Sequence, residues 1–344
     1  MARRVSGQSL IIRFLTVAAL CGLAFAAGLL TPDQQTVVDH ISENSLRGNL
    51  SFIASDLLEG RATPSRGLDL AAEFIASQFR RAGLEPIGDH DYFQTATLPK
   101  GKARNVVGLL RGSDPMLAGT YVILSAHYDH LGMRPDGKDR IYNGANDDGS
   151  GTVSVIEIAS ALAALPVHPK RSILFLTFYG EEPGLLGSHY YVDHPLEPLD
   201  KTIAEVNLEQ IGRTDATDGR HVNIVFVTGY DYSNVGSILA AAAQPAGVEI
   251  KDIHGDYYER ADNLWFARAG VPAHTLAVAA EFSDYHGVGD EWQKIDYANM
   301  AKVDRAIALG VLRLASDATP PQWNESSAAA RPYANAAEAA RRGR

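Results

Sequence analysis

Cysteine is almost absent from this 344-residue chain: the only one is Cys21, inside an apolar segment near the N-terminus. If that segment is removed, the chain can form no disulfide and no thiolate metal site. A metal ion would then have to be bound by His, Asp and Glu side chains, which suit hard or borderline cations.

Positive charge is also in short supply, since 31 Lys and Arg stand against 41 Asp and Glu and the net charge is −10. Nucleic-acid-binding proteins generally present a basic face, so the composition argues against nucleic acid as a partner. Hydrophobic residues make up 46% and charged residues 21% of the chain, which is ordinary for a globular protein. The length suits one large α/β domain or two modest domains.

The N-terminal segment has the pattern of a secretory signal peptide. Its apolar stretch, residues 14–30, contains the small-x-small cleavage pattern Ala24-Phe25-Ala26 and is preceded by three arginines, Arg3, Arg4 and Arg13. We therefore predict a signal peptide over residues 1–26 and export to the periplasm or the medium. The alternative is an uncleaved membrane anchor, because the apolar stretch approaches the length of a short spanning helix.

Strand-like apolar runs alternate with helical patterns along the rest of the chain. Residues 33–85 are predicted to be helical around a loop at 59–64, and later strands and helices alternate. The predicted strands are 105–110, 121–126, 173–179, 202–208, 221–228 and 271–279, and the later helices are 152–165, 188–193, 233–243, 262–269 and 296–315. This order predicts one three-layer α/β domain, residues 27–316, with a mostly parallel mixed sheet and helices on both faces. The composition after Ala318 predicts a poorly ordered tail, residues 317–344.

Two adjacent acids follow one of these strands. Residues 173–179 show no polar alternation, which is typical of a strand buried on both faces, and Gly180 then breaks the strand before Glu181 and Glu182. Ligands bind at the carboxyl ends of strands in open parallel sheets. Two neighbouring acids are costly to desolvate unless a positive group shares their charge. The alternative for the pair alone is a solvated surface turn.

Other potential metal ligands have the same placement. They follow a strand or precede a helix: His127, Asp129, Asp147, Glu209 and His286. Right-handed crossovers would bring the strand-end loops to one edge of the sheet, so we expect these side chains to lie together. Alone, Asp147 would be interpreted as a helix cap and Glu209 as a surface acid. Together, two histidines and several carboxylates suit zinc.

The motifs, taken together, resemble those of the co-catalytic zinc aminopeptidases. That family includes secreted bacterial leucyl aminopeptidases and aminopeptidase Y, and it is related to glutamate carboxypeptidase II. The resemblance covers roughly residues 40–315. Its motifs are His127-Tyr128-Asp129, Asn146-Asp147-Asp148-Gly149-Ser150-Gly151, Gly180-Glu181-Glu182 with Gly187-Ser188, Asn207-Leu208-Glu209 and Asp284-Tyr285-His286.

The resemblance implies an aminopeptidase that acts on peptides with two zinc ions per chain. It implies that His127 and His286 each bind one of the two zinc ions and that Asp147 bridges both. Glu182 would complete one site and Glu209 the other. It implies that Glu181 is the general base, that Asp129 orients the His127 ring, and that Tyr285 helps to polarise the scissile carbonyl.

Two departures from the family pattern limit what can be transferred. Asp is usual where this chain has Glu209, and Gly287-Val288-Gly289 replaces the Thr-Pro that usually follows the last histidine. Two other functions remain open on the same fold: glutaminyl cyclisation with a single zinc ion, and a non-catalytic binding domain. The sequence leaves no obvious room for an inserted protease-associated domain.

Overall fold

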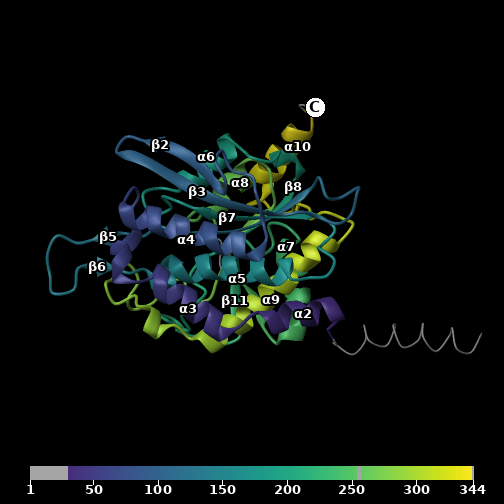
Figure 1. Cartoon of the computed structure of the whole chain (residues 1–344). Coiled ribbons are helices and arrows are strands. Elements are labelled where there is room, and N and C mark those ends of the chain that lie inside the picture. The colour runs from purple at the N-terminus through teal and green to yellow at the C-terminus, as the bar shows by residue number, and fades with distance from the viewer. Residues whose placement is uncertain (1–29, 254–256, 343–344) are drawn as a thin grey trace, which may run out of the picture.

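The computed structural model describes residues 30–253 and 257–342, and Figure 1 shows their arrangement. The predicted signal peptide, residues 1–26, and Cys21 lie outside these ranges. Within the described ranges, no helix combines the length and the apolar character needed to cross a membrane.

One large mixed sheet forms the middle layer of the molecule. Its order is β1 (Glu85–Pro86), β3 (Gly101–Leu110), β7 (Ser172–Phe178), β4 (Tyr121–His127), β8 (Thr202–Leu208), β13 (Ala273–Ala277), β11 (Ile224–Thr228) and β12 (Glu249–Ile253), and β2 (Phe93–Leu98) pairs with β3. The central strands β7, β4, β8 and β13 are parallel, whereas β3 and β11 run antiparallel to their neighbours β7 and β13. The predicted mixed sheet is therefore confirmed, with its parallel pairs concentrated at the centre.

Strand β7 is buried on both faces, as its unbroken apolar sequence predicts. Ile173 and Phe175 pack into the hydrophobic core on one face of the sheet, and Leu174, Leu176 and Phe178 pack into the core on the other. This two-sided burial follows from the alternation of side chains along a strand.

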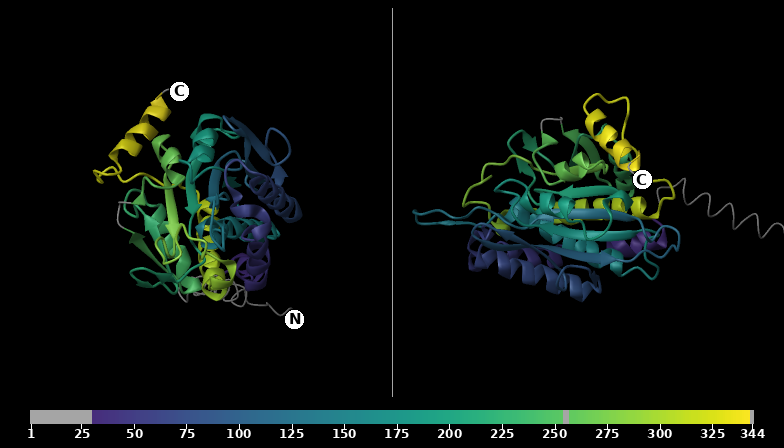
Figure 2. Two further views of the ribbon diagram at one scale, coloured as in Figure 1. Left: turned by 90° about the vertical axis from the view of Figure 1, so that its left-hand side faces the viewer. Right: turned by 90° about the horizontal axis from the view of Figure 1, so that it is seen from above.

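Helices cover both faces of the sheet, which completes the three layers (Figure 2). The larger core lies under α2 (Pro32–His40), α3 (Glu43–Ile53), α4 (Arg66–Ala82), α5 (Gly151–Ala163), α7 (Val235–Ala243) and α9 (Tyr297–Ser316). The smaller core on the opposite face lies under α6 (Leu186–Asp193), α8 (Asn263–Arg268) and α10 (Arg331–Arg342). A small hairpin of β5 (Gly132–Met133) and β6 (Ile141–Tyr142) projects from one end in Figure 1.

The prediction of a poorly ordered tail from residue 317 is wrong for the described residues, because this segment packs on the smaller core. Tyr333 of α10 stacks on Trp323 with ring centroids 5.5 Å apart and lies 5.3 Å from the Tyr258 ring. Trp323 Nε1 donates to the Gly270 carbonyl at 2.9 Å, and the Tyr333 hydroxyl donates to Glu259 at 2.7 Å. Trp323 and Tyr333 therefore anchor this segment to the smaller core, although its composition is mostly polar.

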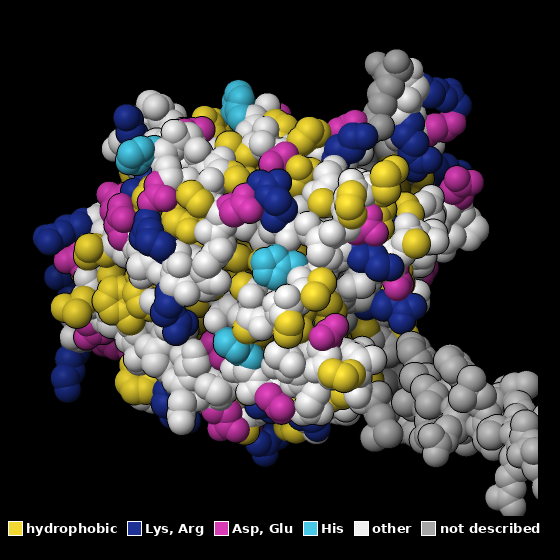
Figure 3. Space-filling model, turned by 45° about the vertical axis from the view of Figure 1, so that its right-hand side comes forward, with side chains coloured by type: hydrophobic (Ala, Val, Ile, Leu, Met, Phe, Trp, Pro, Cys, Tyr) yellow, Lys and Arg dark blue, Asp and Glu magenta, His cyan; other side chains and the backbone are white. Residues whose placement is uncertain are grey.

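The surface carries charge of both signs. On the face shown in Figure 3, Lys and Arg side chains are interspersed with Asp and Glu side chains, with no continuous basic area on that face. This distribution agrees with the net charge of −10.

Replacing the aromatic anchor of α10 should destabilise the protein. Tyr333→Ala removes a side chain that is only 6% exposed, so we expect the free energy of unfolding to fall by about 3 kcal/mol. Arg341→Ala, at an exposed position of the same helix, is the control and should change it by less than about 0.5 kcal/mol. Urea unfolding measures both, and equal small effects would mean that α10 does not dock in solution.

Candidate metal centre

The parallel strands bring the sequence-predicted residues to one edge of the sheet. His127 is the last residue of β4, Glu181 and Glu182 follow β7, and Glu209 follows β8. β4 lies between β7 and β8 and runs parallel to both, so their carboxyl ends are neighbours. His286 enters from the loop that follows β13.

Asp147 lies at the centre of this group. Its Oδ1 is 3.4 Å from His127 Nε2, and its Oδ2 is 3.2 Å from His286 Nε2. The second histidine also lies 3.3 Å from Glu182 Oε2. A single carboxylate therefore faces two imidazole rings, one with each oxygen.

Backbone hydrogen bonds hold Asp147 in this position. It lies in the short helical turn η2 (Ala145–Ser150) that leads into α5. The buried Asp290 carboxylate accepts from the N–H groups of Asn146 and Asp147 at 2.9 to 3.0 Å. Asp148 Oδ1 accepts from Gly151 N–H and Gln210 N–H, each at 3.0 Å, which joins the turn to the end of β8.

Gly180 allows both acids after β7 to face the centre. Its φ of +70° ends the strand, and a Cβ there would lie 3.1 Å from the Leu186 Cβ. Regular strand geometry would send Glu181 and Glu182 to opposite faces. Here Glu181 Oε2 lies 3.9 Å from His127 Nε2, and Glu182 reaches His286. The predicted break at this glycine is confirmed.

Asp129 links two of the predicted residues. His127 Nδ1 lies 3.5 Å from Asp129 Oδ1 and 3.3 Å from the Asp129 carbonyl oxygen. The same Oδ1 accepts from the Glu181 backbone N–H at 3.0 Å. The fully buried Asp129 carboxylate thus lies against the His127 ring and binds the backbone at the start of the acidic turn.

The side-chain amide of Asn207 binds the Glu209 carboxylate. Asn207 Nδ2 donates to Glu209 Oε1 at 3.1 Å, and the Glu209 N–H donates to the Leu276 carbonyl on β13. This side chain lines the same cavity as His127, Asp147, Glu181, Tyr285 and His286. Tyr285 stacks on the His286 ring with centroids 4.0 Å apart.

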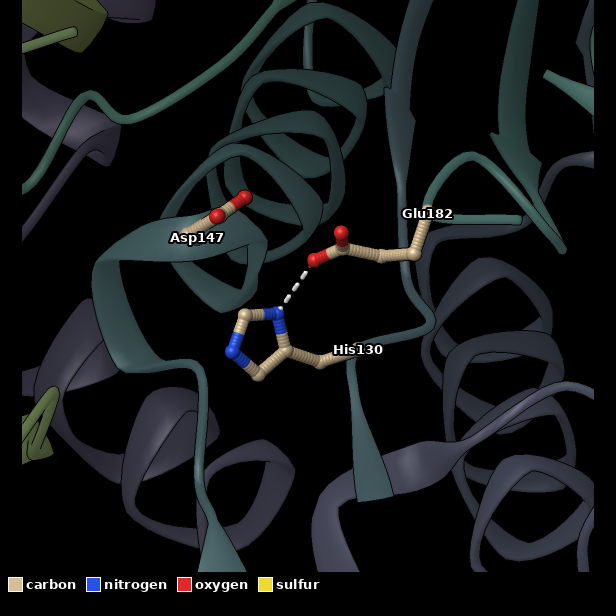
Figure 4. A group of neighbouring side chains, drawn as sticks. All are labelled: His130, Asp147 and Glu182. Atoms are coloured by element: carbon tan, nitrogen blue, oxygen red, sulfur yellow. Dashed lines mark ion pairs between the residues drawn. The ribbon is translucent and has the colours of Figure 1, made fainter. Parts of the chain in front are cut away.

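His130 is a further member of the centre that the sequence analysis did not assign. Its Nδ1 lies 2.6 Å from Glu182 Oε1, and Figure 4 shows the ring pointing toward the Glu182 carboxylate with Asp147 nearby. His130, Asp147 and Glu182 together have the spacing of a metal-binding group. The signal was its place three residues beyond the end of β4. Asp290, by contrast, gave no sequence signal.

The electrostatics of the centre separate its carboxylates into two kinds. Burial raises the pKa of Glu181 and Glu209 well above the usual value, because these side chains lack a direct hydrogen bond from a cation. Burial acts on Glu182 too, but hydrogen bonds from His130 and His286 outweigh it and lower the pKa of Glu182 to about 2. The Asp147 and Glu182 carboxylates in turn raise the pKa of His286 to about 10.

The donor set fits a bound metal ion. Asp147 Oδ2 is buried and near His286 Nε2, yet it makes no hydrogen bond, and His130 Nε2 is also buried without one. Orphaned buried polar atoms are costly, and a cation beside Asp147 would satisfy its free oxygen. Imidazole and carboxylate are the ligand types of catalytic zinc sites.

Comparison with known proteins gives a family match. The model of the family described as "Peptidase family M28" matches residues 105–311, more than half of the chain. A probable zinc metalloprotease of Pyrenophora tritici-repentis is 27% identical over 254 residues, which cover 68% of this chain and 57% of the relative. The chain spans about half of the length of the first curated relatives it matches, at 57%, 54% and 47%.

Solved structures show the same fold at low identity. The LapA aminopeptidase of Legionella pneumophila superposes with a TM-score of 0.66 at 20% identity, covering 83% of this chain and 76% of that one. A glutaminyl cyclase of Porphyromonas gingivalis superposes with a TM-score of 0.62 at 19% identity, covering 79% and 98%. At such identities the similarity establishes the α/β fold alone.

Substitution of Gly180 tests how strongly the acidic turn depends on its backbone. Gly180→Ala should cost about 1–2 kcal/mol of stability for the left-handed conformation, and it should also reduce metal retention by pushing the acids away from Leu186. Gly83→Ala is the matched control, since Gly83 has a φ of +80° and a Cβ added there would meet nothing within 4 Å. Calorimetry and metal analysis measure both, and full metal retention in Gly180→Ala would contradict this role.

Proposed function

Since the chain belongs to peptidase family M28, we propose that it is a zinc-dependent aminopeptidase that hydrolyses the N-terminal peptide bond of peptides. The observation that carries the proposal is the Asp147 carboxylate, whose two oxygens face His127 and His286 separately at 3.4 and 3.2 Å. One carboxylate between two imidazoles is the arrangement that a pair of ions needs. Export, as the N-terminal pattern predicts, belongs to the same proposal.

We assign the ligands of two zinc ions from these contacts. Asp147 would hold both ions. His127 and Glu209, which both line the cavity, would complete one site, and Glu182 with His286 would complete the other. His130 supports Glu182 through its Nδ1, because it contacts that carboxylate at 2.6 Å whereas His286 lies against two carboxylates.

The reaction then depends on a base outside the ligand set. When bound, the zinc ions supply Lewis acidity, which lowers the pKa of water and polarises a carbonyl. Glu181 accepts the proton of the attacking water and passes it to the leaving amine. Its placement supports this role: its side chain lines the cavity, its N–H donates to Asp129, and burial raises its pKa well above the usual value of a glutamate.

The rest of the cavity suits the N-terminal end of a peptide. The lining includes Glu281, an acid outside the ligand set that can attract a cationic α-amine, and the small residues Ala261, Ala277 and Ala280. The Tyr285 hydroxyl stays protonated at neutral pH, since burial and neighbouring acids raise its pKa, so it can donate to a substrate carbonyl.

Glutaminyl cyclisation is the alternative that shares the fold. An aminoacyl anilide and an N-terminal glutaminyl peptide, assayed side by side with and without a chelator, separate the two reactions. The proposal predicts chelator-sensitive release of the aniline and no cyclised product. A cyclised product without hydrolysis of the anilide would contradict the aminopeptidase proposal and support glutaminyl cyclisation.

The two adjacent acids should differ in their effects. Glu181→Gln should keep its zinc and lose about 10²- to 10⁴-fold in kcat, because it removes only the base. Glu182→Gln should lower zinc content, because it removes a ligand. Glu249→Gln, an exposed acid on β12, is the control and should change neither quantity. Metal analysis and steady-state kinetics provide the readouts, and full activity in Glu181→Gln would rule out its role as the base.

A further inference from the structure

A fully buried arginine lies beneath the metal centre, in a segment that the proposed function does not use. Arg61 ends the short helix η1 (Asp56–Arg61) that precedes α4, has a φ of +50° and is 0% exposed. Among the described residues, no carboxylate forms a direct ion pair with its guanidinium. A buried charge without such a partner is costly, so its hydrogen bonds must supply a specific compensation.

The guanidinium donates to four backbone carbonyls. Nε donates to Tyr128 O at 2.8 Å, Nη1 donates to Ile53 O and Asn143 O at 2.6 Å each, and Nη2 donates to Gly144 O at 2.9 Å. These carbonyls belong to the end of α3, the turn after β4 and the segment before η2. The planar fork of arginine can join three segments in this way because its donors have fixed directions.

Two of those segments carry proposed metal ligands. Tyr128 lies between His127 and Asp129, and Asn143 and Gly144 lead directly into the turn that presents Asp147. One side chain therefore ties the backbone beside His127 to the backbone before Asp147. The two side chains themselves meet, with His127 Nε2 3.4 Å from Asp147 Oδ1.

The segment around Arg61 reinforces the link from the other side. The Arg61 carbonyl accepts from His130 N–H at 3.3 Å, and Thr63 Oγ1 donates to Asp129 Oδ2 at 3.1 Å. Gly60 packs so closely that a Cβ would lie 2.2 Å from Gly132 O. If Arg61 only capped the C-terminus of α3, it would need only the hydrogen bond to the Ile53 carbonyl. That role leaves the other three hydrogen bonds of the guanidinium unexplained.

The charge of Arg61 also acts on the centre. Burial lowers its pKa to about 10, opposed by the nearby acids Asp129, Asp290, Asp147 and Asp148, so the guanidinium remains charged at neutral pH. It provides a permanent positive charge beside a crowded set of carboxylates.

We propose that Arg61 is a positioning residue that sets the spacing of His127 and Asp147 and thereby the affinity and coordination geometry of the metal centre. The inference rests on the proposed function, because it takes these two side chains as metal ligands. Residues that support ligands from outside the coordination shell commonly change metal affinity about 10- to 100-fold when replaced.

The test compares Arg61→Met and Arg61→Lys with a matched arginine in the full-length protein. Arg171 is also buried and donates to backbone carbonyls, those of Asp317 and Ala318, but it precedes β7 at the opposite edge of the sheet. Arg171→Met should lower the unfolding temperature and leave zinc binding unchanged. The measurements are zinc affinity by chelator competition, the visible spectrum of the Co²⁺-substituted protein, and thermal unfolding.

Arg61→Met should weaken zinc binding about 10- to 100-fold and shift the Co²⁺ bands, and Arg61→Lys should recover part of the loss because an ammonium has three donors. If folded Arg61→Met binds zinc with wild-type affinity and gives the wild-type Co²⁺ spectrum, the inference about Arg61 is wrong but the proposed function stands. If the wild-type protein binds no zinc, the proposed function itself is wrong. If the Met variant does not fold, Arg61→Lys decides by the same readouts. Failure of both to fold would make Arg61 a folding determinant and also overturn the inference.

Discussion

Repulsion among carboxylates at one buried edge is the constraint on which this structure depends. Four carboxylates converge where three parallel strands end: those of Asp147, Glu181, Glu182 and Glu209. Each contacts His127 or His286 or lines the same cavity as these histidines. Such a group is stable only if positive charge offsets the acids or some of them stay protonated. The raised pKa values of Glu181 and Glu209 and the lowered pKa of Glu182 show both responses within a single site.

The surrounding fold holds these acids close together against that repulsion. The central sheet supplies ends that cannot move apart, because β4 is paired on both sides by β7 and β8. Backbone N–H groups bonded to Asp290 and Asp148 hold the turn that carries Asp147. Arg61 adds a buried positive charge and joins two of the segments. Together these contacts hold the acids and imidazoles of the centre close to one another.

Long apolar runs made much of the fold predictable from sequence. The boundaries of β8, Thr202–Leu208, are those predicted, and the break at Gly180 was expected because two acids follow it. Edge strands were harder: β2 and β12 were missed, since Phe93–Leu98 and Glu249–Ile253 mix polar and apolar residues and gain their order from neighbours. Helix α10 was missed because its composition is polar and its docking depends on Trp323 and Tyr258.

The sequence predicted those residues of the centre whose position along the chain marks them, directly after a strand or at the start of a helix. All eight sequence-predicted side chains lie in or against one site, because each follows a strand or opens a helix. Arg61 had no such signal, since its four acceptors are backbone carbonyls and three of them are 67 to 83 residues away. Asp290 is similar: it bonds to N–H groups 143 and 144 residues earlier.

Metal content provides the most direct test of the central claim that Asp147 serves two ions at once. Zinc per chain can be measured by mass spectrometry on the wild-type protein and on Asp147→Asn after removal of free metal. The account predicts two zinc ions in the wild type and loss of both in the variant. A wild type with a single ion, or a variant that retains two, would contradict it.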